Sequence, residues 1–463
     1  MNNRISVVVL AAGLGTRMKS KLAKVLHCVG GQTLAGHVVQ AACAITPPED
    51  ITVVIGHQAE QVRASLAALG VHFMHQTEQQ GTGHALLTCR DSLHEADGLL
   101  MVLYGDTPLL TSATLHRLVD KHRRHHAAAT LITTRLEDPS TYGRVILDDQ
   151  GHVRAIVEQK AATPQQLAIH LINSGIYCFN ADLLWKHIGE IRPDNPANEY
   201  YLTDIVAILN RAGHTVQSME VKESSELLGI NTRVDLSVVD KVIRDRKARD
   251  LMLAGVTIEK PETVSIDAQV TVGIDTIVGP FTRLLGNTAI GEDCRIGSGS
   301  VIENSRIGDG VRVAPLTMIA DSHIHNGALV GPFARLRQHC DVGASAHIGN
   351  FVELKNTRLG EGAKANHLAY LGDAEVGERA NVGAGSITCN YDGTSKHPTR
   401  IGAGAFIGSN STLVAPIEIG PGSYTGAGSV ITEDVPEGAL ALGRARQVVK
   451  EGWVKAKKSE RKP

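Results

Sequence analysis

The sequence predicts two fold classes in one chain, an α/β layered domain followed by a parallel β-helix. The β-helix is predicted by a six-residue repeat, in which Ile401, Ile407, Leu413, Ile419 and Ile431 keep one phase. The α/β domain is predicted by apolar runs that alternate with helical patterns in the first half of the chain. A polar helical stretch between the two halves predicts a linker.

The six-residue repeat extends over most of the chain after residue 255. The same spacing occurs at Val330, Leu336, Val342, Ile348 and Leu354. This period fits neither an α-helix nor a flat amphipathic strand, but it fits short strands joined by tight turns. Chance spacing in a glycine-rich segment is the alternative, and the number of in-phase positions argues against it. We therefore expect stacked coils that bury a ladder of aliphatic side chains.

Four apolar runs in the first half are predicted to be strands, at residues 5–10, 51–55, 99–104 and 128–133. Helical patterns at residues 58–69 and 111–126 separate some of them. This alternation is typical of an α/β sheet, in which ligands bind beyond the carboxyl ends of the strands.

Two polar segments follow such strand ends. Residues 10–18 (LAAGLGTRM) form a glycine-containing turn whose amides could hold phosphate, with Lys24 close behind. The third glycine of a dinucleotide fingerprint is missing, so a plain strand-to-helix turn is the alternative. Asp106, in Tyr104-Gly105-Asp106, stands where a metal ligand is expected, although a helix cap is the alternative.

The basic cluster of residues 122–126 (HRRHH) ends the predicted helix 111–126. We expect a solvated helix end whose positive charge complements the helix dipole. Metal or nucleic-acid binding is the less favoured alternative.

A single helix is predicted over residues 232–254, because Thr232 and Asp235 form a capping pattern and Gly255 ends the segment. Its second half is highly polar, which is typical of a solvent-bridging spacer. The predicted organisation is therefore residues 1–231, a linker helix at 232–254, and residues 255–463.

Composition excludes several classes of protein. Of the 463 residues, 46 are basic and 48 acidic, so the charge does not indicate a nucleic-acid-binding protein. The seven scattered cysteines predict reduced thiols in a cytoplasmic protein. No apolar run approaches the roughly 20 residues that cross a bilayer. The basic C-terminal tail, residues 455–462, is expected to be solvated and frayed.

The first 230 residues resemble the sugar-1-phosphate nucleotidyltransferases, which implies a Rossmann-like domain. The matching motifs, in order, are the turn with Arg17 and Lys24, residues 76–83 (QTEQQGTG), Tyr104-Gly105-Asp106, Tyr142-Gly143-Arg144, residues 157–160 (VEQK), residues 172–175 (INSG) and residues 198–204. The family usually has proline before the loop lysine, whereas this chain has Ala23, which leaves the rigidity of the loop open.

This resemblance implies roles for individual residues. Asp106 and Asn231 would hold Mg²⁺, a hard cation that prefers oxygen ligands, while Arg17 and Lys24 would neutralise phosphates. The other implied substrate-binding residues are Leu10, Ala11, Ala12, Gly13, Gln76, Gly81, Thr82, Tyr104 and Gly105 for the nucleotide, and Gly143, Glu158 and Asn173 for the sugar.

The second half resembles the hexapeptide-repeat acyltransferases, which implies a left-handed coil. The features that depart from the repeat are Glu353 and Lys355 beside Leu354, His367 and Tyr370, and residues 389–399. By this resemblance His367 is the general base, because imidazole accepts a proton near neutral pH, and Glu353 is the candidate that orients it. The implied substrate residues are Arg337, Lys355, Tyr370 and Asn381 for a sugar phosphate, and Ala384, Asn390, Tyr391, Ser409, Ala427 and Arg444 for acetyl-CoA.

Together, the two halves resemble a bifunctional bacterial enzyme family that makes UDP-N-acetylglucosamine for peptidoglycan and lipopolysaccharide. The implied reactions are acetylation of glucosamine 1-phosphate and uridylyl transfer from UTP to N-acetylglucosamine 1-phosphate, in a homotrimer without membrane insertion. Two alternatives are a non-catalytic regulatory protein with the same domains, and a uridyltransferase whose β-helix serves only to form the trimer. The charged residues argue against the first, and His367 argues against the second.

Overall fold

The structure is a computed structural model that describes residues 4–93, 98–139 and 141–459. The chain forms two compact units, the first ending at Ile243 and the second beginning at Arg244. Among the described residues, none of the helices has the length and apolar character to cross a membrane.

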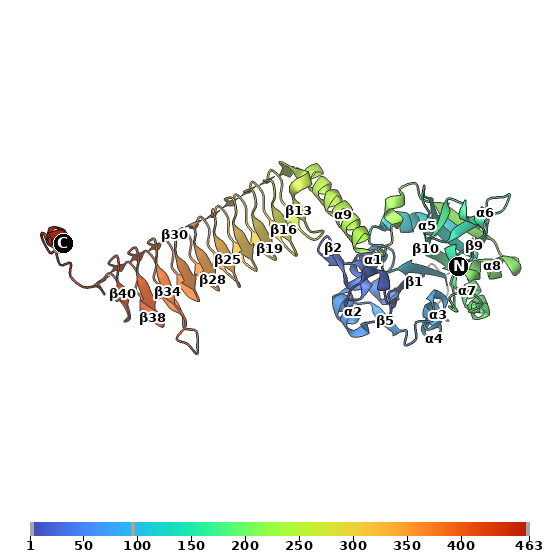
Figure 1. Cartoon of the computed structure of the whole chain (residues 1–463), viewed down its shortest axis with the longest axis horizontal. Coiled ribbons are helices and arrows are strands. Elements are labelled where there is room, and N and C mark those ends of the chain that lie inside the picture. The colour runs from blue at the N-terminus through green and yellow to red at the C-terminus, as the bar shows by residue number, and fades with distance from the viewer. Residues whose placement is uncertain (1–3, 94–97, 140, 460–463) are drawn as a thin grey trace. The chain divides into compact units, whose positions relative to one another are not determined.

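The first unit is built on a mixed sheet with strand order β11-β7-β10-β6-β1-β4-β5. Figure 1 labels β1, β5 and β10 of this sheet, with helices around them. These strands are β1 (Ile5–Leu10), β4 (Ile51–Ile55), β5 (His72–His75), β6 (Leu99–Tyr104), β7 (Ala129–Arg135), β10 (Leu171–Asn180) and β11 (Val216–Glu220). Three of the four predicted strands match observed bounds, and the fourth is shifted by one or two residues. The antiparallel strand β10, between β6 and β7, was not predicted.

The sheet is buried on both faces, because alternate residues of β1 enter two different cores. Val8 belongs to one cluster and Val9 to the other. On the Val9 side pack α1 (Leu34–Cys43), α2 (Ala59–Leu66) and α5 (Ser112–His125); on the Val8 side pack α3 (Thr82–Leu87), α7 (Ala181–His187) and α8 (Asp204–Arg211). The unit also contains the hairpins β2 (Cys28–Val29) with β3 (Gln32–Thr33) and β8 (Arg144–Leu147) with β9 (Val153–Val157), the one-turn helices α4 (Arg90–Leu93) and α6 (Pro164–Leu167), and short 3-10 helices.

The prediction that residues 122–126 form a solvated helix end is wrong for His122. Its side chain is 3% exposed, and its Nδ1 lies 3.0 Å from the Thr130 hydroxyl of β7. Burial, with a smaller contribution from Arg123, lowers the pKa of His122 to about 4. The helical periodicity turns this position inward, whereas residues 123–126 are exposed.

The buried His122 is expected to make the first unit less stable in mild acid. Between pH 6.5 and 4 this ring is protonated in the unfolded chain but stays neutral in the folded chain. The free energy of unfolding therefore falls as the pH falls. From pH 7.5 to pH 5 the free energy of unfolding should fall by about 2 kcal/mol because of this group. Urea unfolding followed by fluorescence of the buried Trp185 measures it. The same loss in His122→Gln as in the unchanged chain would contradict this attribution.

The second unit is a parallel β-helix with three sheets, whose coils are stacked along the labelled series β13 to β40 (Figure 1). The first face contains β12 (Thr257–Ile258), β15 (Ile277–Val278), β18 (Arg295–Ile296), β21 (Arg312–Val313), β24 (Leu329–Val330), β27 (His347–Asn350), β30 (Lys364–His367), β33 (Asn381–Val382), β36 (Phe406–Ile407), β39 (Tyr424–Thr425) and β41 (Leu440–Ala441). The second face contains β13 (Ser265–Ile266), β16 (Arg283–Leu285), β19 (Val301–Glu303), β22 (Met318–Ala320), β25 (Arg335–Arg337), β28 (Glu353–Lys355), β31 (Tyr370–Gly372), β34 (Ile387–Cys389), β37 (Thr412–Val414) and β40 (Val430–Ile431). The third face contains β14 (Thr271–Val272), β17 (Ala289–Ile290), β20 (Arg306–Ile307), β23 (His323–Ile324), β26 (Asp341–Val342), β29 (Arg358–Leu359), β32 (Ala374–Val376), β35 (Thr399–Ile401) and β38 (Ile417–Ile419).

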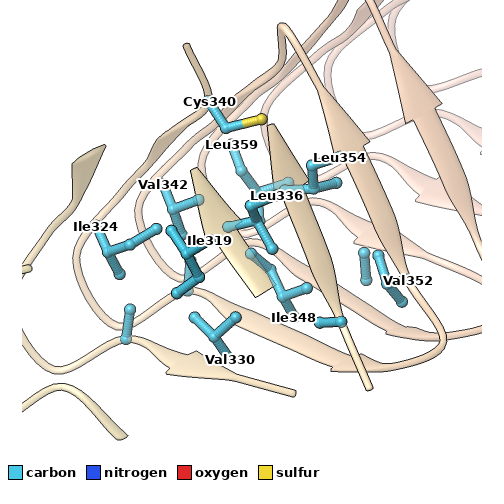
Figure 2. Packing of buried hydrophobic residues seen from close by; sticks show 14 of the residues in the cluster. Ile319, Ile324, Val330, Leu336, Cys340, Val342, Ile348, Val352, Leu354 and Leu359 are labelled. Atoms are coloured by element: carbon cyan, nitrogen blue, oxygen red, sulfur yellow. The ribbon is translucent and has the colours of Figure 1, made fainter. Parts of the chain in front are cut away.

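The predicted aliphatic ladder is confirmed as the core of this unit. Val330, Leu336, Val342, Ile348 and Leu354 lie on successive strands and are at most 1% exposed. Figure 2 shows them gathered inside the coils. Burying each such side chain contributes roughly 1.5–3 kcal/mol.

A glycine follows several ladder residues because the next coil passes too close for a side chain. A Cβ on Gly408 would lie 2.5 Å from the backbone nitrogen of Ala427. Any larger residue there would therefore push neighbouring coils apart.

The predicted helix 232–254 is observed as α9 (Arg233–Leu253). Its start has the expected reciprocal cap, in which Thr232 N donates to Asp235 at 2.8 Å and Asp235 N donates to the Thr232 hydroxyl at 3.2 Å. In the first unit, Asp240 accepts from Gly30 N at 2.7 Å. In the second unit, Leu251 joins the β-helix core. The division between the units falls inside this helix.

The C-terminal tail is exposed, as expected, but it contains the short helix α10 (Trp453–Ser459). Lys457 Nζ lies 4.5 Å from the centre of the Trp453 ring. Arg461 and Lys462 lie outside the described residues.

Candidate functional site

A pocket of about 490 Å³ opens at the carboxyl edge of the first unit's sheet. Leu10 and Tyr104 are register partners, so the residues that follow β1 and β6 meet at this edge. The pocket is lined by the predicted residues Leu10, Ala11, Ala12, Gly13, Arg17, Lys24, Gln76, Gly81, Thr82, Tyr104, Asp106 and Asn231. Gly105 continues the edge, where its N–H donates to Leu10 O at 3.0 Å.

Four polar side chains converge in this pocket. Lys24 Nζ donates to Asp106 Oδ2 at 2.5 Å and to Asn231 Oδ1 at 3.4 Å. Arg17 Nη2 donates to the same Asn231 oxygen at 2.8 Å. Two cationic side chains and two oxygen acceptors therefore meet, although Asn231 is far from the others in sequence.

The turn after β1 positions Lys24 through a glycine. Gly15 has φ +60°, and a Cβ there would lie 2.6 Å from Lys24 Cβ. Only glycine combines this conformation with such close contact.

Gln58 also holds the loop, through contacts that include Ala23. Ala23 stands at the position where the family usually has proline. Its Oε1 accepts from Ala23 N at 2.7 Å, and its Nε2 donates to Lys21 O at 2.7 Å. Gln58 itself has φ 54°, a strained conformation for a residue other than glycine. The side chain thus clamps the segment that carries Lys24.

Shortening Gln58 is expected to slow uridylyl transfer on the order of tenfold, because Lys24 would lose its fixed position. Gln58→Asn keeps a residue type that tolerates positive φ but cannot span both contacts. Ala23→Pro should rescue it, since Ala23 has φ −56°, within the range of proline. Pyrophosphate release by the two single variants and the double variant measures this coupling. An equal effect of Gln58→Asn with Ala23 and with Pro at position 23 would contradict it.

The other side of the pocket is shaped by backbone contacts. Gly81 has φ +106°, and a Cβ there would lie 2.6 Å from Tyr200 O. Gln76 is 3% exposed and donates to Gly81 O at 3.2 Å. Thr82 accepts from Leu202 N at 3.1 Å through its hydroxyl.

The predicted sugar residues form a neighbouring group. Asn173 N donates to Gly143 O at 2.9 Å, and a Cβ on Gly143 would lie 3.4 Å from Glu158 Oε1. Burial raises the pKa of Glu158. Burial also raises the pKa of Tyr104, and the carboxylates of Glu158 and Asp106 make smaller contributions in the same direction.

In the second unit, part of the predicted sugar-phosphate set gathers on the second face. Glu353 and Tyr370 are register partners, and so are Arg337 and Lys355. Lys355 is 8% exposed, and the adjacent ammonium of Lys396 lowers its pKa. Lys396 belongs to residues 389–399, which interrupt the repeat as predicted and connect β34 of the second face to β35 of the third. Asn381 lies instead on β33 of the first face.

His367 is exposed at the end of β30 and does not face the core. Its Nδ1 lies 2.6 Å from Asn350 Oδ1. This contact differs from the prediction, which gave the orienting role to Glu353. Asn350 is the register partner of His367 one coil earlier, whereas Glu353 lies past the corner and accepts from Arg337 Nε at 2.7 Å.

Three of the predicted acetyl-CoA residues continue the line that His367 begins. Backbone hydrogen bonds between successive coils connect the residues of this corner. They run from Leu368 N to Asn350 O (3.1 Å), from Gly385 N to His367 O (3.2 Å), from Asn410 N to Ala384 O (2.7 Å) and from Gly428 N to Ser409 O (2.8 Å). The resulting column is Asn350, His367, Ala384, Ser409 and Ala427.

The other three predicted acetyl-CoA residues lie apart from this column. Asn390 Nδ2 donates to Asp373 Oδ2 at 2.5 Å, and Tyr391 is 61% exposed with its hydroxyl bound to Gly393 O. Arg444 is exposed in the segment after β41. Gly443 O accepts from Val430 N at 3.0 Å, which places the neighbouring Arg444 near β40, whereas His367 ends β30.

Sequence reasoning missed Gln58, Asn350 and Lys396. Asn350 could have been found, because it precedes His367 by the length of one coil. Gln58 carried no such signal, since only the folded loop shows its contact.

Comparisons with known proteins match both units. Residues 7–170 match the family described as MobA-like NTP transferase domain, and residues 269–304 and 398–433 match Bacterial transferase hexapeptide (six repeats). The chain is 60% identical to "Bifunctional protein GlmU" of Solibacter usitatus, over 99% of this chain and 98% of that protein. The same description applies to relatives from Koribacter versatilis (52% identity, 100% and 99% covered) and Cyanothece sp. (46%, 97% and 98%).

Proposed function

The chain belongs to the family of bifunctional GlmU proteins, and from this we propose that each unit carries one transferase site. It is a bifunctional transferase of UDP-N-acetylglucosamine synthesis, with a nucleotidyltransferase domain and a hexapeptide acetyltransferase domain. We assign uridylyl transfer to residues 1–231 and acetyl transfer to residues 255–463, with residues 232–254 as the linker. The product would feed peptidoglycan and lipopolysaccharide synthesis.

The convergence of Arg17, Lys24, Asp106 and Asn231 carries the uridyltransferase proposal. A phosphate oxygen of N-acetylglucosamine 1-phosphate attacks the α-phosphorus of UTP, and pyrophosphate leaves. Such a transfer needs alignment and neutralisation of charge more than covalent help. The two cations supply charge, while the amides after β1 and the Gln76 side hold the nucleotide. Gly143, Glu158 and Asn173 would bind the sugar.

Asp106 and Asn231 fit a Mg²⁺ ion. Their oxygens both lie within hydrogen-bonding distance of the same cationic group, Lys24 Nζ, so they face a common position. Both are hard oxygen donors, as Mg²⁺ prefers. When bound, the ion would add positive charge beside the triphosphate.

His367 is proposed as the base for acetyl transfer. Because the Asn350 amide oxygen accepts from Nδ1, the proton is held there and Nε2 is left free to accept another. The amine of glucosamine 1-phosphate attacks the acetyl-CoA carbonyl, its proton passes to Nε2, and the thiolate of coenzyme A leaves. Lys355, Lys396 and Arg337 form a cationic group that suits the sugar phosphate.

The corner beside His367 favours an extended acetyl-CoA site. The residue at the turn of this corner has positive φ in each coil. In the coils up to that of His367 the turn residues are Phe333, Phe351 and Leu368. In the following coils they are Gly385, Asn410 and Gly428. Bulky side chains therefore give way to small ones along Ala384, Ser409 and Ala427. This leaves room for a long ligand whose thioester end lies at His367.

We also propose a homotrimer whose neighbouring copies complete the acetyltransferase site. Five apolar residues with positive φ protrude at one corner, and each is 48–67% exposed; they are Phe281, Leu316, Phe333, Phe351 and Leu368. Strain and apolar exposure together favour a surface that another copy covers. Such a copy would supply its own Arg444, which is exposed in the segment after β41.

Leu368→Glu is expected to shift the assembly from trimer to monomer, because it puts a charge into this apolar corner. Acetyl transfer should then fall while uridylyl transfer remains. Light scattering of the unchanged chain and the variant measures the mass. A trimer that survives the substitution with full activity would place the interface elsewhere.

The cytoplasm is the proposed compartment. Within the part of the chain that the structure describes, the seven cysteines form no disulfide, which is typical of a reducing environment.

The full reaction tests the proposed function. Purified protein with glucosamine 1-phosphate, acetyl-CoA, UTP and Mg²⁺ should yield UDP-N-acetylglucosamine. Omitting acetyl-CoA should stop synthesis, and adding N-acetylglucosamine 1-phosphate should restore it. Formation of UDP-glucosamine from glucosamine 1-phosphate and UTP in the absence of acetyl-CoA would overturn the order of the reactions.

A further inference from the structure

Two histidines and an aspartate meet on the third face of the β-helix, outside both proposed active sites. His323, Ile324 and His325 are consecutive, and Ile324 is fully buried. Because side chains alternate along a strand, both histidines point outward. Asp341 is the register partner of His323 in the next coil. Figure 2 shows Ile324 and Val342, the inward neighbours of these residues, inside the core.

The donor atoms of the three side chains are close together. His325 Nε2 lies 2.8 Å and His323 Nδ1 3.8 Å from Asp341 Oδ1, and the two rings have centroids 4.0 Å apart. One donor from each residue lies within 4.8 Å of the others. Donors bound tetrahedrally at zinc distances are ~3.3 Å apart, so small side-chain rotations would bring all three onto one ion.

The chemistry of the donors selects the class of ion. Two imidazoles and one carboxylate suit a borderline divalent ion such as Zn²⁺ and not Mg²⁺. Imidazole binds metal in its neutral form.

The surroundings limit the strength of binding. Arg358 Nε lies 3.8 Å from Asp341 Oδ2, and an ion would replace the contact between His325 Nε2 and Asp341 Oδ1. Arg306 is the other register partner of His323. Both guanidinium groups oppose a cation, so binding should be weaker than in a closed structural zinc site.

We propose that His323, His325 and Asp341 form a surface site for a divalent transition-metal ion such as Zn²⁺, which links two successive coils. A groove of about 630 Å³, lined in part by His325 and Asp341, leaves the remaining coordination positions open to water. Because the ion bridges the coils of β23 and β26, its binding stabilises the folded β-helix.

Calorimetric titration of the metal-free full chain with ZnCl₂ alone tests the proposal. The unchanged chain should bind one more Zn²⁺ per chain than the double variant His323→Gln/His325→Gln. Asp341→Asn should weaken the same site at least tenfold. A matched double variant at exposed histidines of α5, His116→Gln/His125→Gln, should keep full binding.

Thermal unfolding provides a second measurement. Without metal, the unchanged chain and His323→Gln/His325→Gln should have the same Tm, which shows that the variant folds. Zn²⁺ should raise the Tm of the unchanged chain only. Equal Zn²⁺ binding and equal Tm in both proteins would overturn the site and leave His325 and Asp341 as an ion pair.

Discussion

His367→Ala is expected to abolish acetyl transfer and to leave uridylyl transfer unchanged. Loss of a positioned base slows proton transfer on the order of 10²–10⁴-fold. The side chain is exposed at a strand end, so its removal should not disturb the aliphatic ladder. The two units have separate cores, which is why the other activity should persist. Parallel assays of coenzyme A release and pyrophosphate release measure both reactions.

Two further variants separate a catalytic role from a structural one. Asn350→Ala should lower kcat for acetyl transfer and change its pH profile, because it frees the Nδ1 tautomer of His367. His339→Asn, at an exposed histidine of the same unit, should change neither activity. If His367→Ala removed both activities in a folded protein, the two sites would not be independent.

The β-helix could be predicted in detail because its core depends on one local rule. Successive aliphatic residues of the six-residue repeat lie on successive faces of the coil, and each points inward. The core positions of residues such as Leu336 and Ile348 could therefore be predicted without long-range information. The mixed sheet of the first unit was harder. The antiparallel direction of β10 depends on the path of the chain, and the apolar run does not encode that path.

The candidate sites show the same division. Asp106 could be placed because it directly follows a predicted strand. Its approach to Asn231 rests on a loop that returns to the sheet from far along the chain, and only the resemblance indicated it. His367 was predicted, but its partner was not. Which residue contacts it depends on the length of a coil, which puts Asn350 and not Glu353 beside the ring.

Asp106→Asn is expected to reduce uridylyl transfer on the order of 10²–10³-fold, with acetyl transfer intact. The substitution keeps the shape of the side chain and removes its charge. It therefore weakens the proposed Mg²⁺ site and also leaves Lys24, whose side chain is 15% exposed, without its carboxylate partner. Pyrophosphate release at increasing Mg²⁺ concentration is the measurement.

The dependence on Mg²⁺ distinguishes these two effects. If Asp106 holds the ion, the variant should need more Mg²⁺ for half-maximal rate, and Lys24→Met should leave that requirement closer to its original value. Asp120→Asn, at an exposed carboxylate of α5, serves as the control and should behave as the unchanged chain. An unaltered Mg²⁺ requirement in Asp106→Asn would mean that the Asp106 carboxylate only positions Lys24. A metal ligand that loses its charge should bind the ion less tightly.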